Sequence, residues 1–260
     1  SCFLLTEKEL SLMSKDASIN SDNLHLLEYS SPLNLYGVEE IVKENDKVID
    51  SWRGQRYPAM VKLLENVQEK IDFHNAIARA LITKNRYYDA GVEIGLSNRE
   101  EALNRGSVLN YGILQVMLRN ADEAIINLQN YLKDDPLNAE ACFYLGNAHE
   151  LKQNLNQALK YYEAAAQKEP LNYEYVLAYG KSLLRNGKTL GGITFVKKAV
   201  DLKGLDFRNG FLLIQAFFAN QQFGSEIETI KLLLKDYPNS YGLHEAMANG
   251  YVALKQYPQA

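Results

Sequence analysis

The 260-residue sequence is poor in cysteine, proline and tryptophan, with two, six and one of these residues, respectively. Two thiols, Cys2 and Cys142, are too few to define a disulfide framework, and neither belongs to a repeated Cys/His spacing that would build a zinc site. The four histidines lie far apart, and no His-Glu-x-x-His spacing occurs. We therefore expect no metal centre, and we interpret Cys142 as a small buried residue of a helix.

Long apolar runs and an excess of basic charge are also lacking. The apolar stretches, such as residues 211–214 and 232–234, are far shorter than the roughly 20 residues needed to cross a bilayer. The formal net charge is −4, and the lysines are scattered rather than clustered, which leaves no basic field to attract phosphate backbones. The sequence therefore predicts neither a transmembrane segment nor a nucleic-acid partner.

The common fingerprints of catalysis and cofactor binding do not occur. The sequence contains no Gly-x-Ser-x-Gly elbow, phosphate-binding loop or dinucleotide fingerprint. We interpret the pair Gly191-Gly192 as small residues required by helix packing. We therefore predict that the chain is not an enzyme and holds no cofactor. Its composition, with 47% hydrophobic and 23% charged residues, suits a protein with a substantial core.

The prolines set a period. Pro136, Pro170 and Pro238 are separated by 34 and then 68 residues, and the skipped position is Gly204, a residue that also ends helices. Each break is followed by a residue suited to cap the next helix: Asn138, Asn172, and Asn239 or Ser240. A 34-residue unit then divides the sequence into segments 105–138, 139–172, 173–206, 207–240 and a partial 241–260.

The same kinds of residue recur within these segments. Small residues stand at the eighth place in Gly112, Gly146, Gly180 and Ala248, with Ile214 as the exception. They stand again at the twentieth place in Ala124, Ala158, Gly192 and Ala260, with Glu226 as the exception. Large apolar residues follow four positions later, which places them on one helical face: Leu128, Tyr162, Val196 and Ile230.

This period and these positions resemble the tetratricopeptide repeat family, most clearly over residues 145–170, with Gly146, Ala158, Tyr162 and Pro170 in register. The resemblance covers residues 105–260 and implies an all-α, right-handed superhelical solenoid of about six antiparallel helical hairpins. The sequence departs from the family pattern in carrying His149 where tyrosine is usual. The family's tryptophan is also missing, and its place holds Val108, Cys142, Val176, Gly210 and His244.

The remaining segments are less regular. Residues 37–104 are interpreted as degenerate hairpins, made of a hairpin over 37–70 and a degenerate repeat over 71–104. Residues 1–36 show no clean period and are expected to form a cap, a tether or a strap. Because the last unit stops where its second helix should begin, we expect the natural chain to continue beyond residue 260, since a lone helix would leave an apolar face uncovered.

In the family that this sequence resembles, the first helices line a concave inner face, which implies a groove here. Asn147, Lys181, Gln215 and Asn249 would form a polar seam that bonds a partner's backbone. Capture of a chaperone's C-terminal carboxylate is disfavoured, because only Asn147 and Arg208 are of the required type at the corresponding positions. The predicted groove residues are Leu109, Ile113, Met117, Phe143, Asn147, Leu177, Lys181, Arg185, Arg208, Phe211, Gln215, Phe218 and Asn249.

The expected function is a non-catalytic scaffold or adaptor that binds a segment of another protein in this groove. One alternative is the targeting domain of a larger enzyme that continues past residue 260. Another is an envelope lipoprotein, anchored through Cys2, that organises a secretion, pilus or polymer-export complex. The default compartment is the cytoplasm, with the bacterial envelope as the alternative, and self-association through uncapped repeat ends is a further expectation.

Overall fold

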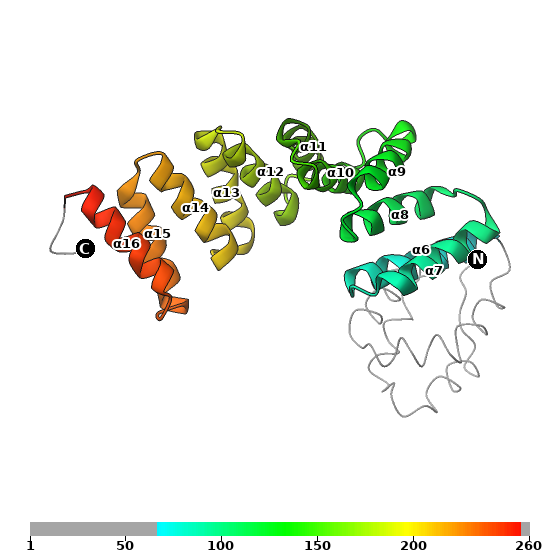
Figure 1. Ribbon diagram of the computed structural model, residues 1–260, viewed down its shortest axis with the longest axis horizontal. Helices are drawn as coiled ribbons and strands as arrows, with labels where there is room; N and C mark the ends of the chain where they lie inside the picture. Colours follow the sequence, from blue (N-terminus) through cyan, green and yellow to red (C-terminus); the bar gives the residue numbers. More distant parts are fainter. Residues whose placement is uncertain (1–66, 256–260) are drawn as a thin grey trace, which may run out of the picture. The chain divides into compact units, whose positions relative to one another are not determined.

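The computed structural model describes residues 67–255, and in this range it consists of helices joined by short turns, without a strand (Figure 1). Residues 1–66 and 256–260 lie outside the described range, so the predicted N-terminal cap and most of the first predicted hairpin are not part of this description. The helices are α6 (Val67–Thr83), α7 (Tyr87–Glu100), α8 (Arg105–Met117), α9 (Ala121–Asp134), α10 (Ala139–Leu151), α11 (Leu155–Lys168), α12 (Tyr173–Arg185), α13 (Thr189–Lys203), α14 (Phe207–Ala219), α15 (Phe223–Asp236) and α16 (Tyr241–Ala253).

Alternate helices begin at caps spaced 34 residues apart. Asn104, Asn138, Asn172 and Asp206 precede α8, α10, α12 and α14, and each side chain accepts a hydrogen bond from the backbone N–H three residues ahead. This bond satisfies one of the amides that the first helical turn leaves unpaired. The caps predicted at Asn138 and Asn172 are confirmed, whereas Ser240 takes the cap position of α16 without a side-chain bond.

A second structural period marks the turn inside each hairpin. Residues with left-handed backbone recur every 34 positions, with φ between 57° and 74°: Asn85, Arg119, Gln153, Gly187, Gln221 and Lys255. Only Gly187 adopts this conformation without the steric cost of a Cβ atom, which is about 1 kcal/mol or more for an ordinary residue. The hairpin turn is therefore imposed by the packing of its two helices more than by the residue that occupies it.

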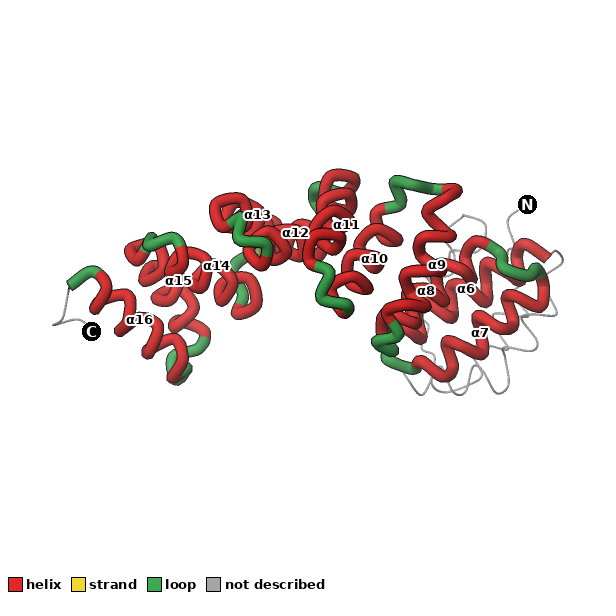
Figure 2. Tube along the Cα trace, turned by 45° about the horizontal axis from the view of Figure 1, so that its top comes forward, coloured by secondary structure: helices red, strands yellow, loops and turns green. Residues whose placement is uncertain are grey.

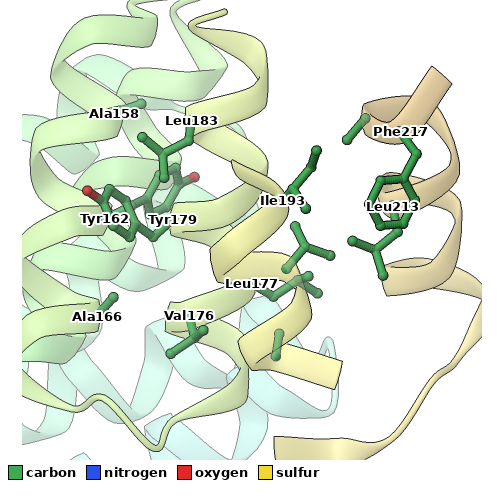
Figure 3. Packing of buried hydrophobic residues seen from close by; sticks show 13 residues of the cluster. Ala158, Tyr162, Ala166, Val176, Leu177, Tyr179, Leu183, Ile193, Leu213 and Phe217 are labelled. Atoms are coloured by element: carbon green, nitrogen blue, oxygen red, sulfur yellow. The ribbon is translucent and has the colours of Figure 1, made fainter. Parts of the chain in front are cut away.

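The described part of the chain divides into two compact units, the first ending at residue 127 and the second beginning at residue 128, inside α9. In the second unit, each helix from α10 to α16 packs on the next one along the chain (Figure 2). Its largest core cluster lies among α11, α12, α13 and α14 (Figure 3). The predicted all-α architecture of antiparallel helical hairpins is confirmed.

Small residues permit the closest approaches between paired helices of the second unit. A Cβ atom on Gly146 of α10 would lie 2.7 Å from the ring of Tyr162 in α11. One on Gly180 of α12 would lie 2.9 Å from both Cγ2 and the backbone nitrogen of Val196 in α13. Real Cβ atoms do not approach other atoms this closely, so these two positions require glycine as long as the helices keep their spacing.

The first unit is stabilised partly by buried polar groups. Asn104 Oδ1 accepts from Asn75 Nδ2 at 2.9 Å, and Asn104 Nδ2 donates to Ser97 Oγ at 2.9 Å. His74 Nδ1 lies 3.0 Å from Glu93 Oε2, and both side chains are almost fully buried. Buried polar groups need such partners, because an unpaired one costs the free energy of its lost hydration.

Candidate functional site

A cavity of about 440 Å³ opens on the second unit among α10, α12 and α14. These are the first helices of three consecutive hairpins, so the 34-residue period brings equivalent faces of the three helices around one hollow. The lining residues are Phe143, Asn147 and Glu150 from α10, Tyr162 from α11, Leu177, Ala178 and Lys181 from α12, and Phe207, Arg208, Phe211 and Leu212 from α14.

One part of the cavity wall is aromatic. The ring centroid of Phe143 lies 4.9 Å from that of Tyr175 and 5.9 Å from that of Tyr162. On α14, Phe207 and Phe211 are nearly parallel, with centroids 6.0 Å apart, and they are 42% and 44% exposed, respectively. Large apolar side chains that stay this exposed around a hollow are unusual in a monomer and typically mark a contact surface.

The other part of the wall is organised by the Glu150 carboxylate. Its Oε1 atom accepts from Lys181 Nζ at 3.0 Å and also from Arg185 Nη1, and its Oε2 atom accepts from the Tyr162 hydroxyl at 2.7 Å. The same hydroxyl lies 2.7 Å from Asn147 Oδ1. Residues of α10, α11 and α12 are thus joined in one hydrogen-bonded network beside the aromatic wall.

This network keeps Glu150 ionised and Tyr162 neutral. Burial alone would raise the pKa of Glu150, but hydrogen bonds from Tyr162 and Lys181 and the charges of Lys181 and Arg185 outweigh it, so the pKa is lowered. Burial, followed by the adjacent Glu150 charge, raises the pKa of the Tyr162 hydroxyl far above its ordinary value. The tyrosine therefore remains a hydrogen-bond donor throughout the physiological pH range.

A second ion pair involves Arg208, another residue that lines the cavity. Arg208 Nη1 donates to Glu174 Oε2 at 2.8 Å, and the two side chains are 59% and 45% exposed, respectively. An ion pair this exposed contributes little free energy, because water screens it and the long side chains lose entropy when they pair. The Arg208 guanidinium can therefore change partners at small cost.

The structure brings several predicted groove residues around this cavity and leaves others away from it. Gln215 and Phe218 are exposed on α14 and Asn249 is exposed on α16, but none of the three lines the cavity. Arg185 adjoins the cavity through its bond to Glu150. The predicted residues that line it are Phe143, Asn147, Leu177, Lys181, Arg208 and Phe211, with Leu177 at 1% exposure deep in the wall.

The predicted residues of α8 differ from this pattern. Leu109 and Ile113 are 9% and 0% exposed, respectively, which corrects the prediction that they offer surface to a partner. Helices α6 and α7 both pack on α8, the helix that carries these two residues. Met117 is half-buried at the end of the same helix.

The sequence prediction missed Phe207 and the polar role of Tyr162. Phe207 precedes Phe211 by four residues on α14, and this i, i+4 spacing was the available signal for a shared aromatic face. Tyr162 was predicted only as a packing residue, and its hydroxyl contacts depend on residues of the neighbouring helix. No local pattern in the sequence indicates those contacts.

The histidines of the described range lie in separate places. His149 is buried and stacked on Tyr161, and His244 Nε2 lies 2.8 Å from the carbonyl oxygen of Pro238. Among residues 67–255, no group of three His, Cys, Asp or Glu side chains is placed to hold a metal ion. Within that same range, no helix has the length and apolar character that a membrane span needs.

Comparison with known protein families identifies the repeat. The sequence profile of the tetratricopeptide repeat matches residues 112–166 and 152–206. Residues 112–206 are therefore tetratricopeptide repeats. No curated protein matches the sequence.

Several solved structures share the fold. A tetratricopeptide repeat protein from Parabacteroides merdae superposes with a TM-score of 0.57 at 14% identity, over 72% of this chain and 75% of its own. The pilF protein of Pseudomonas aeruginosa gives 0.60 at 16% identity, over 83% and 99% of the two chains. A thermophilic repeat protein of Thermus thermophilus gives 0.52 at 16% identity, over 70% and 99%. Identities this low relate the folds alone.

Proposed function

We propose that this chain is a non-catalytic scaffold whose second unit binds a segment of another protein against α10, α12 and α14. Proteins of this repeat family generally serve as interaction scaffolds, and stacked helical repeats offer extended binding surfaces. The observation that carries the proposal is the cavity that the three helices form, with Phe143 of α10 and Phe211 of α14 in its wall. A hollow of this size accepts a few side chains rather than a folded domain.

The polar residues of the wall suit the backbone of a bound segment. Asn147 and Arg208 line the cavity beside the aromatic rings, and amide and guanidinium groups bond peptide carbonyls well. Along α14, Gln215 and the half-exposed Phe218 would extend the contact beyond the cavity. Asn249 of α16 would be the last residue of this surface, and either an extended strand or an amphipathic helix could occupy it.

Other expectations from the sequence stay predictions. The repeat boundaries, self-association through repeat ends and a role for Met117 rest on the sequence pattern. The two alternative functions, a targeting domain of a larger enzyme and a lipoprotein anchored at Cys2, concern parts of the protein outside residues 67–255.

The proposal is tested by site-specific photo-cross-linking in the full chain. A benzoylphenylalanine is placed at Phe211 in the cavity wall or, as a matched control, at the exposed Lys160 on α11. We expect protein adducts at position 211 that are absent at position 160 and that disappear when Phe143→Ala is added. Helical circular dichroism establishes that each variant is folded.

The same adducts at both positions would contradict the proposal, as would adducts at position 211 that survive the Phe143→Ala substitution. The double variant Phe143→Ala, Phe211→Ala provides an independent measurement. It should lose the partners that the wild-type chain retains in a pull-down, because both aromatic contacts are then missing.

A further inference from the structure

The wall of the cavity carries more positive than negative charge. Glu150, Lys181 and Arg208 line it, Arg185 is bonded to Glu150, and Glu174 is bonded to Arg208. These five groups comprise three cations and two carboxylates. The chain as a whole has a formal net charge of −4, so the local excess is opposite in sign to the rest of the protein.

The surplus charge is concentrated where α10 meets α12. Glu150 is a single carboxylate shared by Lys181 and Arg185, and its second oxygen is already occupied by the Tyr162 hydroxyl. Neither cation has a carboxylate of its own among the described residues. A further carboxylate placed beside Lys181 would therefore be attracted without displacing Glu150.

Arg208 provides a second contact for an anion in the cavity wall. Its pairing with Glu174 is solvent-exposed and therefore weak. Its guanidinium can form a bidentate bond with a carboxylate of a bound segment, which a lysine cannot do. Lys181 and Arg208 lie on neighbouring first helices and line the same cavity.

The apolar wall lies next to these cations. Phe143, Phe211 and Leu212 line the cavity together with Lys181 and Arg208. A large apolar side chain and a carboxylate from adjacent residues of one peptide would thus find complementary surfaces in a single hollow. A basic peptide would place its charge against cations that are already in excess, which costs free energy.

We propose that the segment bound in this cavity carries an aspartate or glutamate next to a large apolar residue, with the carboxylate at Lys181 and Arg208 and the apolar side chain against Phe143, Phe211 and Leu212. This proposal rests on the proposed function and specifies the chemistry of its partner. Glu150 of α10 positions Lys181, and Glu174 of α12 positions Arg208. The carboxylate that these cations bind comes from a side chain within the segment and needs no free chain end.

The test is a selection of random peptides displayed internally in a carrier protein, so that no terminal carboxylate is present. The full chain is the bait, and the variant Phe143→Ala, Phe211→Ala is the counter-selection. We expect the peptides retained only by the wild-type chain to be enriched in Asp or Glu beside Phe, Tyr, Trp or Leu. If no peptide distinguishes the two baits, the proposed function itself fails.

If the retained peptides depend on the two phenylalanines but are neutral or basic, the groove stands and the charge proposal alone is overturned. The strongest selected acidic peptide then serves for affinity measurements by fluorescence anisotropy. Lys181→Met and Arg208→Gln should each weaken its binding about 3- to 10-fold at low salt, and less at high salt. The control Lys168→Gln, at an exposed site on α11 that does not line the cavity, should change binding less than about 2-fold.

Equal effects of all three substitutions would show a nonspecific charge response and overturn the proposal. A selected peptide whose acidic residue can be replaced by Gln or Asn without weakening would also overturn it. Circular dichroism of each variant separates loss of binding from loss of fold.

Discussion

The hairpins α12/α13 and α14/α15 have first helices of equal length and a left-handed residue at the same place in the turn, but they are packed by different residues. In α12, Gly180 allows the close approach to Val196 of α13. The equivalent residue in α14 is Ile214, which is 4% exposed and belongs to the core between α14 and α15. The close approach moves one turn back to Gly210, where a Cβ atom would lie 2.7 Å from Leu233 Cδ1. The repeat requires a small residue facing the paired helix, but it does not require one fixed position.

The second helices of these two hairpins, α13 and α15, also differ at one equivalent position. Gly192 of α13 leaves space that the Leu184 side chain of α12 occupies, whereas α15 carries Glu226 at the equivalent position. Glu226 is 1% exposed, and its Oε2 atom has no hydrogen-bond partner among the described residues. Burial raises the pKa of this carboxyl to about 7. The α14/α15 hairpin thus keeps the common backbone while burying a group that destabilises it at neutral pH and above.

The largest expected effect comes from making α14 resemble α12. Ile214→Gly removes a buried side chain from the core between α14 and α15 and places a flexible residue inside a helix. Because cavity and propensity costs add, we expect a loss of about 4 kcal/mol in the free energy of unfolding. Urea unfolding followed by circular dichroism measures it. An unchanged midpoint would mean that α14 can close on α15 as α12 closes on α13.

Placing a branched side chain in α12, as α14 has, should destabilise the protein somewhat less. Gly180→Val forces a branched side chain against the backbone nitrogen of Val196, which cannot move without shifting α13. We expect a destabilisation of about 3 kcal/mol, at the upper end of the range for overpacking. The control is Gly224→Ala on α15, where a Cβ atom meets nothing within 4 Å and where stability should rise by about 0.5 kcal/mol. Similar losses in both variants would refute the steric explanation.

Replacing the buried carboxyl should stabilise α14/α15 in a pH-dependent manner. Below about pH 4.5 the Glu226 carboxyl is neutral in both folded and unfolded chains. Between that value and about 7, its pKa in the folded chain, the unfolded chain ionises first, so the stability of the wild type falls as pH rises. Glu226→Gln should therefore add about 2 kcal/mol at pH 8 and little at pH 4.5.

Urea midpoints at the two pH values measure this difference. The matched control is Glu228→Gln, an exposed carboxylate on the same helix, which should leave the pH profile nearly unchanged. A Glu226 variant whose profile parallels that of the wild type would show that the carboxyl is solvated.

The smallest expected effect concerns the N-terminal caps of α14 and α16, the helices before and after α15. Asp206 caps α14 through its bond from the backbone N–H of Asn209 at 2.9 Å, and the Asn209 side chain completes a capping box. Asp206→Ala should cost about 1 kcal/mol. Ser240→Ala should cost almost nothing, because the Ser240 side chain makes no capping bond to α16. Equal midpoint shifts for the two variants would contradict the assigned caps.

Contacts that are local in the chain could be predicted from the sequence. The 34-residue period, the caps at Asn138 and Asn172 and the small residues Gly146 and Gly180 were all visible there. Each depends on a helix end or on a repeated position, and both leave a signal in the order of residues. The all-α hairpin architecture followed from them.

Tertiary structure decided which side chains remain available for binding. Lys181 and Glu150 are 31 residues apart and Arg208 and Glu174 are 34 apart, so their pairing depends on how neighbouring hairpins stack. The burial of Leu109 and Ile113 depends likewise on the two helices that pack against α8. The sequence by itself determined where the hairpins begin and end, because caps and helix-ending residues act within a few residues. The charge and openness of the cavity were set only when separate repeats came into contact, since a side chain's exposure is a property of its neighbours in space.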